Sequence, residues 1–114
     1  MVTFNMRWAI SFYSEKVESQ TLALPKGILA NSLRVAELIG EFGPDIGRPH
    51  TAPLGQGLYK IRAKGKEGIA RSVFCTVKGN EIIILITVIK KDNKIPKRHM
   101  DTARKRMKEV LDDE

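Results

Sequence analysis

Alternating polar and apolar residues between positions 57 and 89 predict three consecutive β-strands. In the first of these, successive side chains point to opposite faces of the extended chain. Lys60, Arg62 and Lys64 therefore share one face, and the apolar residues between them share the other. The pattern predicts a strand with a row of cations on one side and core contacts on the other.

Two further strands follow. Residues 69–78 are rich in β-formers and contain one internal charge, Arg71. Residues 82–89 form an unbroken apolar run, mostly β-branched and too short to span a membrane, which predicts a central strand covered on both faces. The glycine-bearing segments 65–68 and 79–80 predict tight turns between the three strands.

The first half of the chain predicts one strand and two helices. Residues 7–13 alternate like a strand, and Ser14 is suited to cap a short helix. Pro25 fits the first turn of a longer helix that ends at Gly43-Pro44. The apolar residues of this second helix recur at helical spacing: they are Ile28, Leu29, Leu33, Val35, Ala36, Ile39 and Phe42.

The segment 43–57, rich in glycine and proline, is expected to be a loop. Pro96 opens a last helix to about residue 111, with an apolar side and a strongly basic polar side that includes Arg106. The predicted order is β-α-α-β-β-β-α. This order predicts an α+β fold: one domain over residues 1–114, with an antiparallel sheet of about four strands, an N-terminal helical hairpin and a C-terminal helix.

Charge is distributed unequally along the chain. Residues 1–56 hold five basic and five acidic groups, whereas the 15 basic and 8 acidic groups from position 57 onward carry the whole net charge of +7. The second half is therefore the expected binding surface, attracting nucleic acid, anionic membrane or an acidic protein. The alternative is a solvated basic surface that only maintains solubility.

Several classes of chemistry lack the residues that they need. Cys75 is the single cysteine, which excludes an internal disulfide, fits a reducing cytoplasm and, inside an apolar strand, indicates a core residue. The two histidines, His50 and His99, have no metal-ligand spacing, and no cofactor or phosphate-loop motif is present. His50 is either a loop acid or base or a structural residue. No signal peptide or transmembrane run is visible.

The cationic row, joined by Arg71 from the neighbouring strand, is the most chemically suggestive feature. When the 2′-hydroxyl of RNA attacks its own phosphate, the hydroxyl loses a proton, the phosphate gains charge and the leaving oxygen gains a proton. Fixed guanidinium groups stabilise such a phosphate. A lysine can transfer the protons if neighbouring cations lower its pKa. A solvated strand face is the alternative.

Several segments, in this order, resemble the phage-derived HigB-like toxins of the RelE/ParE superfamily. The resemblance extends over residues 7–111. It is carried by EFGPDIGRPH at 41–50, PLGQGLYKIR at 53–62, GIAR at 68–71, IKK at 89–91, PKR at 96–98 and ARKR at 103–106.

This resemblance implies a RelE/ParE-like fold and the toxin of a type II toxin–antitoxin pair. Such a toxin is a cytoplasmic, metal-independent endoribonuclease that cuts mRNA on the ribosome and is neutralised by a helix-turn-helix antitoxin in a hetero-oligomer. The implied catalytic residues are Arg62 and Arg71 as phosphate clamps and Lys64 and Lys90 for proton transfer. The residues expected to bind the RNA backbone are Lys60, Lys91, Lys94, Lys97 and Arg98.

Two departures from the family pattern bear on mechanism. Ile86 stands near the position where relatives often carry a histidine, and Ile95 precedes the proline where they often carry Thr or Ser. The chain therefore either depends on Lys and Arg alone or is a weaker nuclease, and the ribosome would supply what is missing by positioning the message. The alternatives are a ParE-like inhibitor that binds DNA gyrase without cutting, and a catalytically silent RNA-binding relic.

Overall fold

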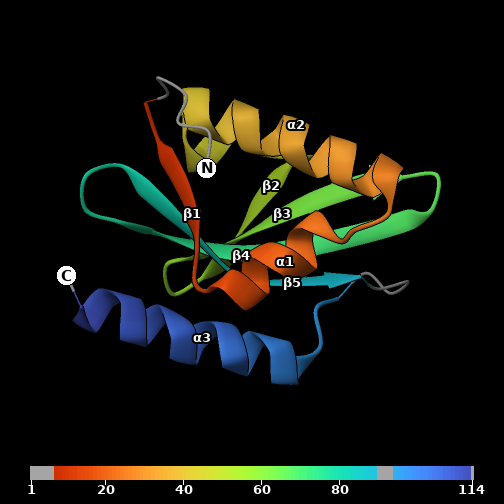
Figure 1. Cartoon of the computed structure of the whole chain (residues 1–114). Coiled ribbons are helices and arrows are strands. Elements are labelled where there is room, and N and C mark those ends of the chain that lie inside the picture. Colours follow the sequence, from red (N-terminus) through yellow and green to blue (C-terminus); the bar gives the residue numbers. More distant parts are fainter. Residues whose placement is uncertain (1–6, 90–93, 114) are drawn as a thin grey trace.

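The computed structural model describes residues 7–89 and 94–113, which form a five-stranded sheet with helices on both faces (Figure 1). The strands lie in the order β1-β5-β4-β3-β2, with β1 parallel to β5 and every other neighbouring pair antiparallel. Their bounds are Ala9–Phe12 (β1), Thr51–Gly55 (β2), Leu58–Gly65 (β3), Gly68–Val77 (β4) and Glu81–Ile89 (β5).

The α+β class and the order of the predicted elements are confirmed, but the number of strands is not. Strand β2 lies inside the segment 43–57, which was expected to be a loop. Pro53 can occupy this strand because β2 is at the sheet edge and pairs only with β3, and the register shifts between Pro53 and Gly55. Because glycine and proline are typical of loops, the sequence pattern did not predict this short edge strand.

Two helices cover one face of the sheet and a third covers the other (Figure 1). Helices α1 (Glu15–Leu22) and α2 (Lys26–Phe42) share the first face, and α3 (Lys97–Asp112) lies on the second. The side chain of Ser14 accepts a hydrogen bond from Val17 N at 3.2 Å, which confirms its predicted role as the cap of α1. None of the helices in the described ranges is long and apolar enough to cross a membrane.

The core beneath α1 and α2 is mainly apolar, but the buried hydroxyls of Thr21 and Ser72 each form a hydrogen bond with Thr87 Oγ1 at 2.8 Å. Its buried members are Val17, Val35, Ile39, Ile61, Phe74, Ile82 and Ile84. The predicted stripe on α2 is narrower than expected, because Leu33 is 49% exposed and Phe42 is 65% exposed. At the end of α2 the buried residues are Ile39, Gly40 and the C-cap Gly43, whereas Phe42 lies on the solvent side of the helix.

A second core lies beneath α3. Its buried members are Leu58, Val73, Cys75, Leu85, Ile86 and Ala103. Cys75 is 1% exposed, which confirms its prediction as a core residue. Strand β5 lies between β1 and β4 and contributes to both cores, through Ile84 on one face and Leu85 on the other, as the apolar run predicted.

Arg106 anchors α3 to the sheet. Leu85 is an extra residue in β5, because its two neighbours pair with successive residues of β4. Arg106 Nη1 donates to the carbonyl oxygen of Leu85 at 2.7 Å, and its guanidinium carbon lies 4.9 Å from the centre of the Tyr13 ring. The Tyr13 hydroxyl donates to a Glu109 carboxylate oxygen. Arg106, expected on the basic outer side of α3, thus contacts the sheet instead.

Candidate functional site

The structure confirms the predicted division of β3 between two faces. Tyr59 and Ile61 pack in the core beneath α2, and Ala63 packs beside the first turn of α2. Tyr59 stacks on Phe74 with ring centres 5.3 Å apart. Because side chains alternate along a strand, Lys60, Arg62 and Lys64 lie on the α3 face.

Arg71 lies opposite Arg62. The two arginines are directly paired in the β3–β4 register, so their side chains share the α3 face. Arg71 is 3% exposed, with Val73 beside it on β4 and Val88 opposite it on β5. The buried guanidinium is expected to hold its position better than an exposed one, while Arg62 is half-buried and Lys64 is exposed.

Lys60 is the group on which these cations converge. Its pKa is lowered, first by burial and then by the positive charges of Arg71, Arg48 and Arg62. Burial and like charge both disfavour the protonated amine. Lys60, predicted to bind the RNA backbone, thus lies among cations that favour its neutral form.

Arg48 is the member of this cluster that sequence reasoning missed. It precedes β2 in a loop that Thr51 holds in place: the Thr51 hydroxyl donates to Pro44 O at 3.1 Å and accepts from Gly47 N at 3.0 Å. Arg62 N also donates to His50 O at 2.9 Å, which joins this loop to β3. The segment 41–50 carries part of the family resemblance, but Arg48 lies within the neutral half of the chain and outside the predicted cationic strand.

The other predicted residues lie farther along the chain. Lys90 and Lys91 fall outside the described residues. Lys94, Lys97 and Arg98 are exposed where the chain enters α3, at the same end of the sheet as the β3–β4 turn (Figure 1). They extend the positive charge of the α3 face toward this end.

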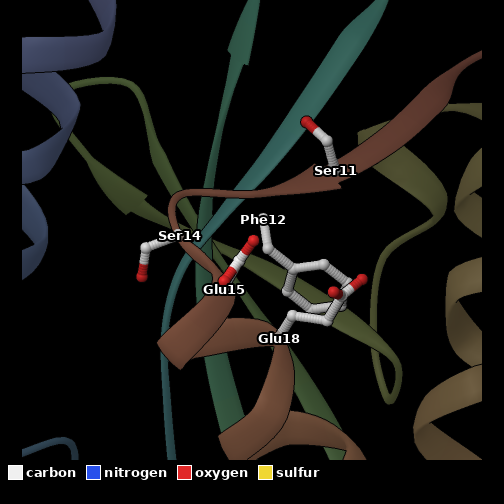
Figure 2. A pocket seen from close by; sticks show the side chains of 5 residues that line it. All are labelled: Ser11, Phe12, Ser14, Glu15 and Glu18. Atoms are coloured by element: carbon white, nitrogen blue, oxygen red, sulfur yellow. The ribbon is translucent and has the colours of Figure 1, made fainter. Parts of the chain in front are cut away.

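A hollow of about 300 Å³ lies at the opposite edge of the sheet (Figure 2). It is lined by Ser11, Phe12, Ser14, Glu15 and Glu18. Its two carboxylates would repel phosphate, so it is unsuited to nucleic acid. Within residues 7–89 and 94–113, no group of histidine, cysteine or acidic side chains is arranged to hold a metal ion.

The arrangement of sheet and helices defines the RelE fold class. A chain of the archaeal RelE–RelB complex from Pyrococcus horikoshii OT3 superposes with a TM-score of 0.56, and the match covers 78% of this protein and 100% of that chain. The sequence identity is 17%, so this likeness shows the fold.

The family follows from the sequence. The model of the phage-derived Gp49-like proteins matches residues 20–108, and the protein belongs to that family. No curated protein matches the chain. The family and the fold together confirm the resemblance to phage-derived toxins of the RelE type.

Proposed function

We propose that this protein is the toxin of a type II toxin–antitoxin pair and acts as an endoribonuclease on mRNA at the ribosome. The observation that supports this activity best is the grouping of Lys60, Arg62 and Arg71 on one face of two paired strands, where burial and the charges of Arg71, Arg48 and Arg62 lower the pKa of Lys60. A group of cations on a rigid sheet is suited to bind a phosphodiester and to stabilise the charge that develops on it.

Each cation has a role in the proposed reaction. Arg62 and Arg71 hold the non-bridging oxygens of the scissile phosphate as the 2′-hydroxyl attacks. Lys60 transfers a proton, because an amine with a lowered pKa is more often neutral near pH 7 and so accepts a proton more readily. Lys64 and Lys90 remain alternative proton-transfer groups. Lys91, Lys94, Lys97 and Arg98 bind the RNA backbone.

The proposed partners follow from the site and the relatives. The ribosome would hold the message in line for attack, supplying orientation that a small open site lacks. The RelE–RelB complex supports an antitoxin as the protein partner. We expect a helix-turn-helix antitoxin that neutralises the toxin in the cytoplasm.

The test compares the wild type with Arg62→Ala and Arg71→Ala in a cell-free translation reaction. Each variant should lower the rate of message cleavage by about 100-fold or more, since each removes a donor to the developing charge. Arg71 is buried, so its variant is also checked by thermal unfolding, while the half-buried Arg62 provides a test less dependent on folding. Wild-type rates in both variants would refute the assignment.

Mapping of RNA ends after induction separates the alternatives. New ends within codons support the nuclease. DNA-damage signalling without new ends supports a gyrase inhibitor. Salt-sensitive RNA binding without toxicity supports a silent relic.

A further inference from the structure

The turn between β3 and β4 rests directly on the first turn of α2. A Cβ atom at Gly65 would lie 2.5 Å from Ile28 N and 2.6 Å from the carbonyl carbon of Gly27, both of them backbone atoms. A side chain at position 65 would therefore push the turn away from the helix. The close approach requires glycine at this position.

Glu67, in the same turn, caps α2 from outside the helix. Its Oε2 accepts a hydrogen bond from Gly27 N at 2.9 Å. The N-cap residue of α2 is Pro25, which provides no side-chain hydrogen bond, whereas α1 has Ser14 in this role. Backbone hydrogen bonds, first from Gly27, lower the pKa of Glu67, as expected for a carboxylate at a helix N-terminus.

A second polar contact lies one turn farther along the helix. Asn31 Oδ1 accepts from Lys64 N at 2.8 Å. Between the two contacts, Ala63 and Ala70 pack with Ile28, and their small side chains let the helix approach the strands. The turn is thus joined to α2 by hydrogen bonds and by apolar packing.

We propose that Glu67 is a positioning residue that, by tying the β3–β4 turn to α2, fixes the cations of the proposed nuclease site. This inference rests on the proposed function. Only two residue pairs, Lys64–Ile69 and Ala63–Ala70, separate the Gly65–Gly68 pair from the Arg62–Arg71 pair. The outer side of the turn is exposed, and α3 packs nearer the start of β3, at Leu58. Release of Glu67 would let the turn end of the hairpin move relative to α2, and the nearby Arg62–Arg71 pair would move with it.

The experiment separates positioning from simple helix capping. Glu67→Ala removes the hydrogen bond to Gly27, and Pro25→Asp then supplies a capping carboxylate to the same end of α2 from its own chain. We expect Glu67→Ala to lower the melting temperature and to lower kcat for message cleavage about tenfold, with KM changing less, because displaced cations lose transition-state contacts. The double variant should regain the melting temperature but not kcat.

If the double variant regains both the melting temperature and kcat, Glu67 is only a helix cap. Wild-type kcat in Glu67→Ala would also overturn the proposal. Glu37→Ala is the matched control, since it removes an exposed carboxylate from α2 itself, one that pairs with Arg34 at 3.7 Å on the helix surface. It should leave kcat unchanged. Pro25→Asp alone should also retain wild-type kcat.

A second readout does not depend on cleavage. NMR titration of the Lys60 side chain reports the cations around it directly. In the double variant, the pKa of Lys60 should return toward that of an ordinary lysine, because the displaced Arg62 and Arg71 repel it less. An unchanged titration would refute the positioning role. If the wild type cuts no RNA, the proposed function fails while this titration still decides the role of Glu67.

Discussion

The two faces of the sheet are both covered by helices, yet they differ in what they leave open. On one face, α1 and α2 bury an apolar core that includes Val17, Ile39 and Phe74. On the other, the single helix α3 covers Leu58 at the start of β3, and the cations lie farther along the strand. The site lies along β3 and β4 beyond Leu58, where Arg71 is buried, Arg62 is half-buried and Lys64 is exposed.

This difference shows how a small domain separates stability from function. The residues up to 56, which are neutral overall, provide the two helices that cover the mainly apolar core. The basic second half provides the cations of β3 and β4 on the α3 face. Cations that repel one another are destabilising when crowded, so the same chain needs an apolar core elsewhere to hold them. The predictions below test this division.

The largest effect on cleavage is expected from substitution of Lys60, on the α3 face of the sheet. Lys60→Met should lower the cleavage rate by about 10²–10⁴-fold, as general acid–base groups typically do. Lys60→Arg is the matched variant, because it keeps the charge but does not release a proton near neutral pH. Single-turnover cleavage and RNA binding are measured together. If Lys60→Arg cuts at the wild-type rate, Lys60 serves only as a charge.

Phe74 represents the opposite face. Phe74→Ala should lower the free energy of unfolding by about 3–5 kcal/mol, because the fully buried ring leaves a cavity and its stack with Tyr59 is lost. Urea denaturation measures the change. Phe42→Ala is the control, since Phe42 is 65% exposed and should change the free energy by less than about 0.5 kcal/mol. Equal losses in both variants would contradict the assignment of this core.

The junction of α3 with the sheet should show a smaller effect. Arg106→Met leaves the Leu85 carbonyl without its donor and should cost about 1–3 kcal/mol of unfolding free energy. Lys105→Met, one residue earlier on the exposed side of α3, removes the same charge and should cost under about 0.5 kcal/mol. Equal stability of the two variants would show that Arg106 does not anchor α3.

The smallest effect concerns the pH dependence of stability. The pKa of Lys60 is lowered in the folded protein, so between that pKa and the ordinary value of about 10.4 the unfolded chain binds more protons. The free energy of unfolding of the wild type should therefore rise with pH relative to Lys60→Met. Tyr13, whose pKa is raised chiefly by its hydrogen bond to Glu109, is present in both proteins and cancels in the difference. A flat difference would show that Lys60 titrates normally.

Local patterns in the sequence were sufficient for most of the fold. Strand alternation, the Ser14 cap and the Gly43-Pro44 stop depend on neighbours a few residues apart, and each is found in the structure. Strand β2 was missed because its evidence is not local. It forms by pairing with β3, despite Pro53 and Gly55 within it.

The sequence by itself determined every α-helix and strand except β2, the strand face on which Lys60, Arg62 and Lys64 lie, and the unequal charge of the two halves of the chain. Only the tertiary structure decided that Arg71 is buried, that Arg48 approaches Lys60, and that Arg106 contacts the sheet rather than solvent. The physical reason is that the face of a strand on which a side chain lies follows from backbone geometry over two residues. Burial and electrostatic environment instead depend on segments that are distant in sequence and meet only after folding.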